Sequence, residues 1–174
     1  AELVLNDEKL DQRMYRLKQP LQPGAELWLT VRGGWQQKGI ANDVEFTGLV
    51  NNGSFFNNQE LLPTLGYEPR MELSDRADRR KHELPPNDRM PKLSEDPVKR
   101  MQNYLMANSD WVNVRTTIST APDQIAIAPG SLRKEWTANG RRYFNYELDK
   151  PSLNFYAFMS ARYEVAREKW NGVD

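Results

Sequence analysis

The chain has 174 residues, a length that suits one domain with a core of useful size. Its 24 basic residues balance 24 acidic residues, so it lacks the excess positive charge that binds nucleic acids or anionic membranes. Without cysteine it has no disulfides, thiolate zinc sites or cysteine nucleophiles. No apolar run approaches the roughly 18 residues of a membrane span, so we expect no insertion into a bilayer by this segment.

The first half of the chain shows the period-two alternation of half-buried strands. Apolar residues alternate with polar ones over 15–21 and again over 26–35, and Gln22-Pro23-Gly24 forms a turn between the two segments. The pattern recurs over 43–50. We therefore predict a stack of hairpins in this half.

The stretch NNGSFFNNQELLPTLGYEP, residues 51–69, admits two interpretations. It could be a binding loop that displays Phe55 and Phe56. It could instead be two short strands joined by a turn at Asn57-Asn58, because asparagine favours turns.

Charged residues and prolines dominate from residue 68 onward. Ser74 is a candidate N-cap for a short helix that Pro85-Pro86 would break. A better helix opens near Asp96-Pro97 and places Val98, Met101, Tyr104 and Leu105 on one face. We predict a surface insertion over 68–108 that holds most of the helix in the protein.

Strand patterns return in the second half. We predict strands over 111–120 and 124–130, and the Ala138-Asn139-Gly140 turn predicts a hairpin. The segment 153–165 fits both a strand and a helical stripe. The predicted fold is mainly β, a two-sheet sandwich or saddle, with 1–174 as a single β domain carrying the insertion.

Few side chains in the sequence suit metal or nucleophilic chemistry. His82 is the single histidine and lies in a charged stretch, whereas a zinc site needs three or four converging ligands. A Ser-His-Asp triad would need the same histidine, and no G-x-S-x-G motif supplies a serine. A pair of catalytic carboxylates has no fixed spacing and stays open. The sequence thus argues against a metal, cysteine or triad enzyme.

Aromatic residues lie on both faces of several predicted strands. One face can be core while the other contacts a neighbouring layer. Alternatively, one face is an interface that a partner covers. The candidate interface residues are Tyr156, Phe158 and Trp170.

Several segments together are similar to a known family. They are WVNVRTTISTAPDQIAIAPGSL, GRRYFNY and KPSLNFYAFM, preceded by LKQPLQPGAELWLTVRGG and LPTLGYEP. Their order over 10–165 resembles the amino-terminal β domain of aminopeptidase N-like zinc metallopeptidases. Gly66-Tyr67 replaces the family's aspartate, and the insertion is longer than usual. Both departures resemble bacterial proteins in which an aminopeptidase-like portion is joined to an ABC-transporter permease.

The resemblance implies a piece of a longer membrane protein on the periplasmic side of a bacterial inner membrane. The family's H-E-x-x-H and Gly-x-Met-Glu-Asn motifs do not occur. Zinc is therefore expected only in a missing catalytic domain, with no cofactor in this chain. Its partners would be the rest of its own chain and a peptide substrate. By position, Asn52, Ser54 and Phe55 would line the substrate pocket, and 153–165 would be a strand.

Two other functions compete with this one. The chain could be a stand-alone β-sandwich module that binds a peptide or glycan through exposed aromatics, or a small hydrolase that uses carboxylates. For the leading hypothesis we expect no stoichiometric zinc and no hydrolysis of aminoacyl reporters by the chain itself.

Overall fold

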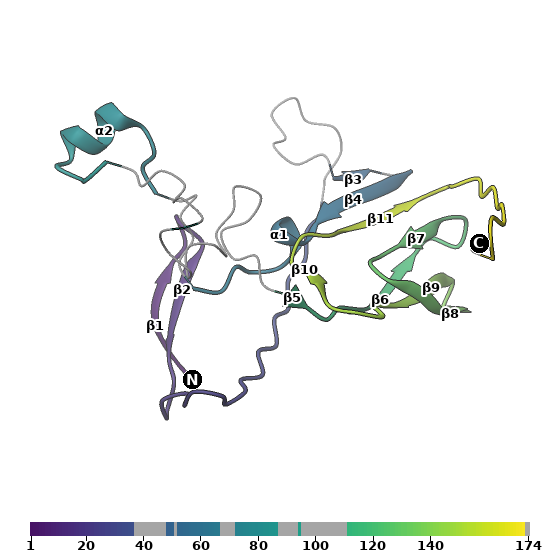
Figure 1. Cartoon of the computed structure of the whole chain (residues 1–174), viewed down its shortest axis with the longest axis horizontal. Coiled ribbons are helices and arrows are strands. Elements are labelled where there is room, and N and C mark those ends of the chain that lie inside the picture. The colour runs from purple at the N-terminus through teal and green to yellow at the C-terminus, as the bar shows by residue number, and fades with distance from the viewer. Residues whose placement is uncertain (37–47, 51, 67–71, 87–93, 95–110, 173–174) are drawn as a thin grey trace. The chain divides into compact units, whose positions relative to one another are not determined.

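The computed structural model describes residues 1–36, 48–50, 52–66, 72–86, 94 and 111–172 (Figure 1). Strands far outnumber helices, so the prediction of a mainly β fold is confirmed. The chain divides into two compact units, Ala1–Trp35 and Gln36–Asp174, and each is described by itself. The assignment of one domain to the whole chain stays a prediction.

The first unit is a β-hairpin followed by an extended segment. Strands β1 (Glu2–Asp7) and β2 (Gln12–Arg16) pair antiparallel. The Asp7 carboxylate closes the connection by accepting hydrogen bonds from the backbone N–H groups of Lys9 and Leu10, at 3.0 and 3.1 Å. The sequence did not predict β1.

The strands predicted over 15–21 and 26–35 are wrong. Strand β2 ends at Arg16, and 26–35 lies outside every strand. The turn between them is present, because the Ala25 N–H donates to the Gln22 carbonyl at 2.9 Å. Leu27 and Leu29 stay exposed. The alternation therefore identified a face of 26–35 that a partner could bury. No described strand pairs with this segment.

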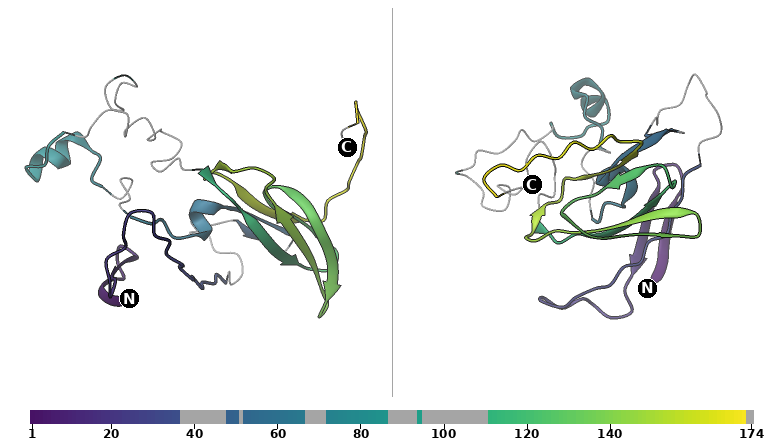
Figure 2. Two further views of the ribbon diagram at one scale, coloured as in Figure 1. Left: turned by 60° about the horizontal axis from the view of Figure 1, so that its bottom comes forward. Right: turned by 90° about the vertical axis from the view of Figure 1, so that its right-hand side faces the viewer.

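The second unit contains two larger antiparallel sheets (Figures 1 and 2). The four-stranded sheet has the order β3 (Leu49–Val50), β4 (Gly53–Asn57), β11 (Ala157–Ala161), β7 (Ile125–Ile127). The three-stranded sheet has the order β6 (Arg115–Thr120), β9 (Arg141–Glu147), β8 (Ser131–Ala138). A short pair joins β5 (Trp111–Val112) to β10 (Ser152–Leu153).

The hairpin β8–β9 forms where its turn residues predict it. Asn139 and Gly140 have φ values of 50° and 70°, the left-handed conformations that a two-residue hairpin turn requires. Gly130, just before β8, has φ 97°, and a Cβ there would lie 2.3 Å from the Glu147 carbonyl oxygen. Glycine is needed at 130 for both reasons.

One apolar cluster joins the two sheets. Its buried members come from both: Ala126, Ala128, Phe144, Tyr146 and Phe158. Phe144 is 1% exposed, and the Tyr146 hydroxyl donates to the Ala126 carbonyl at 3.0 Å. This shared core confirms the predicted two-sheet sandwich.

The ambiguous segment 153–165 contains a strand, not a helix. The strand prediction is confirmed over Ala157–Ala161, where β11 pairs with both β4 and β7. It is too long at both ends, since β10 ends at Leu153 and 162–165 lies outside any strand. Phe158 and Ser160 are buried because alternate residues of β11 face the core and the cleft, whereas Ala157, Met159 and Ala161 on the other face are half-buried.

Two short helices complete the described residues. Helix α1 (Asn58–Leu61) begins where a turn was predicted, and the Asn57 N–H donates to the Glu60 carboxylate at 2.8 Å. The predicted Asn57-Asn58 turn is therefore wrong. This helix also lies outside the insertion predicted to hold most of the helix.

Helix α2 (Arg76–Lys81) lies inside the predicted insertion. Its N-cap is Asp75, not Ser74: one Asp75 oxygen accepts from the N–H groups of Ala77 and Asp78, at 2.8 and 2.9 Å. The helix ends before Pro85. The helix expected near Asp96 falls outside the described residues. Neither described helix is long and apolar enough to cross a membrane.

Candidate functional site

A cleft of about 420 Å³ lies between the two sheets of the second unit. One wall is β6, and the other comes from β3, β4, α1 and β11. The wall opposite β6 is mainly apolar, and hydroxyl groups occur on both walls. The residues that line it are Leu49, Val50, Gly53, Ser54, Phe56, Leu61, Thr116, Thr117, Ile118, Ser119, Thr120, Gln124, Arg141, Phe158 and Ser160.

The cleft follows the edge of β6. Five consecutive residues, 116–120, line it, whereas the side chains of a strand alternate between two faces. An unbroken run therefore indicates contact along the edge. Strand β6 is the terminal strand of its sheet and pairs with β9 alone among the described strands.

The register shows which backbone groups of β6 point toward the cleft. The Leu148 N–H donates to the Val114 carbonyl at 3.1 Å, so the even-numbered residues of β6 exchange hydrogen bonds with β9. The N–H and C=O groups of Thr117 and Ser119 point the other way. The Ser119 carbonyl accepts from Arg141 Nη2 at 2.7 Å. Thr117 has no backbone partner among the described residues on that side.

The opposite wall has a polar contact within an apolar surface. Ser54 Oγ and Ser160 Oγ lie 2.7 Å apart on the paired strands β4 and β11. Where β6 ends, the Thr120 hydroxyl donates to Gln124 Oε1 at 2.7 Å, and both side chains are buried. These hydroxyl groups are thus already hydrogen-bonded.

Arg141 is the one charged residue among the described residues that line the cleft. Its Nε donates to Ser119 Oγ at 3.0 Å, while Nη2 donates to the Ser119 carbonyl. Among the described residues, the lining holds no histidine, lysine or carboxylate that could activate its serines and threonines as nucleophiles.

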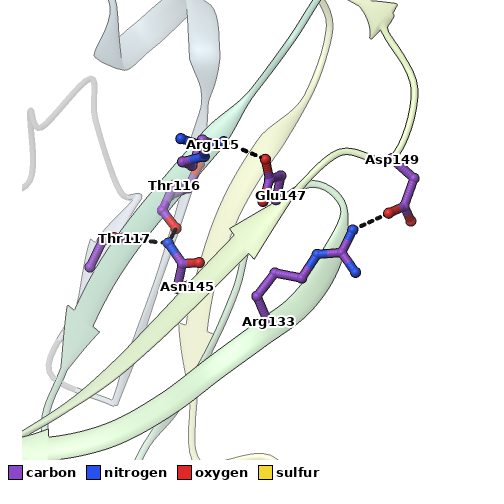
Figure 3. Close-up of polar contacts among 7 residues, drawn as sticks. All are labelled: Arg115, Thr116, Thr117, Arg133, Asn145, Glu147 and Asp149. Atoms are coloured by element: carbon purple, nitrogen blue, oxygen red, sulfur yellow. Dashed lines mark hydrogen bonds and ion pairs between the residues drawn. The ribbon is translucent and has the colours of Figure 1, made fainter.

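Side-chain contacts hold β6 in register with β9 (Figure 3). Arg115 and Glu147 form an ion pair at 2.6 Å, and this hydrogen bond raises the pKa of Arg115. Asn145 Nδ2 donates to Thr117 Oγ1 at 3.1 Å and to the Thr116 carbonyl at 3.3 Å. The hydroxyl of Thr117 therefore accepts a hydrogen bond, whereas its backbone N–H has no partner among the described residues.

Of the three predicted substrate-binding residues, Ser54 alone lines the cleft. Asn52 is exposed in the turn between β3 and β4. Phe55 is 49% exposed, and strand alternation places it on the face opposite Ser54 and Phe56. The expected trio does not come together.

The three predicted interface residues do not form one exposed patch. Phe158 is 8% exposed and belongs to the core, because β11 is an inner strand of its sheet. Tyr156 is half-buried, its ring edge-to-face with Phe158 at 5.7 Å, and burial raises its pKa. Trp170 is 78% exposed. We expected some of these rings to be exposed: Trp170 is exposed and Phe158 is buried.

Most residues of the cleft were not predicted from the sequence. The hydroxyl-rich run RTTIST could have drawn attention to β6, and a single serine in the apolar segment AFMSA could have identified Ser160. Gln124 and Arg141 carry no comparable signal.

His82 lies exposed at the C-terminal end of α2. Across the described parts of the chain, no three histidine or carboxylate side chains converge as a metal site would require.

No protein-family model, curated protein or solved structure matches this chain.

Proposed function

We propose that this chain is a non-catalytic β domain of a membrane-associated, aminopeptidase N-like zinc metallopeptidase. It packs against a catalytic domain elsewhere in the same protein and forms part of the wall of a peptide cleft. The observation that carries this proposal is the position of Ser54. The family resemblance assigns it to the substrate pocket, and it lines the cleft between the sheets.

The order of the strands supports the proposal. Three of the five segments that carry the resemblance coincide with β6, β7, the β8–β9 hairpin and β11, whereas LKQPLQPGAELWLTVRGG and the described part of LPTLGYEP lie outside every strand. The exposed Trp170 offers an apolar surface for an adjoining domain. In this proposal the protein lies on the periplasmic side of a bacterial inner membrane, joined to an ABC-transporter permease.

Zinc belongs to the catalytic domain in this proposal. The described residues of this chain do not fit a zinc site, because the exposed His82 has no converging donors around it. The metal would activate a water molecule for peptide hydrolysis where it is bound. The β domain contributes shape and uncharged surface beside that site.

The parent reading frame provides the first test. We expect an H-E-x-x-H motif within a few hundred residues after Asp174, flanked by apolar spans. In the parent enzyme, Ser54→Trp should raise KM for peptides while zinc content stays unchanged. A frame without the motif, or a parent enzyme whose KM ignores Ser54→Trp, contradicts the proposal.

A second function is supported by the free edge of β6. A stand-alone module could bind a peptide there without any catalytic domain. Specific binding of a peptide by the isolated chain, from a frame that lacks H-E-x-x-H, would favour this alternative.

A further inference from the structure

We propose that the outer edge of β6 binds an extended, uncharged peptide segment, which adds to the three-stranded sheet as a fourth strand inside the cleft. The site belongs to the domain itself and holds whether or not a peptidase domain accompanies it. The inference therefore goes beyond the proposed function and can fail independently of it.

Backbone groups provide the first part of the argument. Thr117 directs an N–H donor and a C=O acceptor into the cleft, and Ser119 adds a second N–H. An extended peptide has donors and acceptors at the same spacing, so it can form the alternating bonds of a sheet ladder. Small molecules rarely match such a row.

The space beside this edge is the second part. A volume of about 420 Å³ falls within the range of ligand pockets, roughly 300–1,000 Å³. It accommodates a few residues of extended chain and not a folded partner. The apolar side chains of Val50, Phe56 and Phe158 would contact alternate side chains of the peptide.

The charge of the cleft lining restricts which side chains a bound peptide can carry. In the part of the lining that the structure describes, Arg141 alone is charged, and its guanidinium donates to Ser119. An ammonium group in the cleft would lose water without gaining an ion pair. A carboxylate could pair only with Arg141, which is exposed, so solvent would screen that ion pair. The favoured segment has small or β-branched uncharged side chains, such as valine and threonine.

The two edges of the three-stranded sheet differ in the way this proposal requires. Proteins commonly protect an open edge from unwanted pairing with charged side chains. The outer strand β8 carries Arg133, Lys134 and Glu135 in succession. Strand β6 instead presents a run of uncharged residues, 116–120, to the cleft. Its contacts with β9 hold that run in an extended form (Figure 3).

Proline substitution tests the backbone contact. Thr117→Pro removes an N–H that β9 does not use, and an edge strand tolerates proline when that N–H faces outward. Thr137→Pro is the matched control, because Thr137 faces outward on the β8 edge by the register of its pair with β9. Thr117→Val removes the hydroxyl contact with Asn145 and keeps the N–H.

The probe is a blocked heptapeptide of alternating threonine and valine. Two isomers of it, N-methylated at odd or at even positions, test the contact without altering the protein. Titration calorimetry measures affinity, and amide hydrogen exchange reports which backbone groups of the protein become protected.

We expect the plain peptide to bind and to slow exchange at the Thr117 and Ser119 amides. Thr117→Pro should weaken binding at least about tenfold, while Thr137→Pro and Thr117→Val should stay within about twofold. At least one N-methylated isomer should lose the same tenfold or more. The result with the N-methylated peptides tests the backbone contact even if Thr117→Pro fails to fold, because it uses the unaltered protein.

Several outcomes would overturn the proposal. They are no binding at millimolar peptide, binding of both N-methylated isomers as tight as that of the plain peptide, or protection at Thr137 instead of Thr117. Protection of Thr117 that grows with protein concentration alone would assign the edge to a second copy of the chain, and the peptide proposal would then be wrong. None of these results bears on whether an H-E-x-x-H motif follows in the reading frame.

Discussion

Residues 26–32 and the β8–β9 hairpin share an alternating pattern but differ in structure. In the hairpin, Trp136 pairs with Tyr143 across the strands, and their rings stack at 5.1 Å. In 26–32, Leu27 and Leu29 stay exposed and no strand forms. The two regions differ in the turn that joins the paired segments. A two-residue turn brings β8 onto β9.

This comparison separates two kinds of sequence signal. Alternation indicates which face of a segment can be buried. A turn with defined geometry indicates which neighbouring segment will pair with it. The β8–β9 hairpin has both signals. The segments on either side of 22–25 alternate and flank a turn, but Pro23 excludes the left-handed φ that a two-residue hairpin turn requires at its position. The following predictions test whether stability follows the same division.

The largest contrast should be between a core aromatic residue and an exposed one. Phe144→Ala empties a fully buried site and should lower the free energy of unfolding by about 3–5 kcal/mol. Trp28, 91% exposed in the first unit, should change it by less than about 0.5 kcal/mol when replaced by alanine. Urea denaturation measures both. Similar losses would show that 26–32 is as well packed as the hairpin.

Two glycines with left-handed φ values give the next contrast. Gly130→Ala places a Cβ against the Glu147 carbonyl and should cost at least about 2 kcal/mol. Gly24 has φ 81° and open space around it, so Gly24→Ala should cost only about 1 kcal/mol. Thermal unfolding of the two variants measures the difference. Equal losses of stability in the two variants would mean that the left-handed φ, and not the contact with Glu147, determines the cost of Gly130→Ala.

Tyr146→Phe should have a moderate effect with a distinct pH dependence. It removes the hydrogen bond to the Ala126 carbonyl, at a cost of about 1–2 kcal/mol near neutral pH. Burial, and then Glu135, raise the pKa of Tyr146 in the folded state. The wild type should therefore keep this stability below pH 10 or so, and lose it as the pH rises through the folded-state pKa. The phenylalanine variant should lack this loss at alkaline pH, as urea denaturation at several pH values would show.

The smallest effect should come from Asp149→Asn at the exposed end of the hairpin. The hydrogen bond from Ser131, and then the contacts of Arg133, lower the pKa of Asp149. Its contribution should be present above the usual pKa of about 4 and disappear as the pH falls through the lower folded-state pKa. The variant should unfold slightly earlier at neutral pH and match the wild type in strong acid. A difference that persists in acid would contradict this assignment.

The sequence predicted those parts of the structure that depend on local geometry. The Asn139-Gly140 turn and the strand at 125–127 follow from residue type and spacing. The strand at 157–161 was predicted from the family resemblance, because the periodicity there fits a helix equally well. The N-cap of α2 was predicted at Ser74 and is Asp75, because serine and aspartate both favour the N-cap position.

The cleft could not be predicted in the same way. Ser54 and Ser160 meet because β4 pairs with β11, and no local pattern states that pairing. The burial of Phe158 follows from the same fact. Sequence alternation assigned rings to faces but could not say that β11 has neighbours on both sides.

The pairing of β4 with β11 has a consequence for the order of folding. Asn58 donates from its side chain to Asn154 and receives the N–H of Tyr156, so the contact closes a loop of nearly a hundred residues. The entropic cost of closing a loop rises only with the logarithm of its length, so the intervening segment can vary in length at little cost. The local β8–β9 hairpin should form early, and the closure between residues 53–58 and 154–161 should form late and limit the rate of folding.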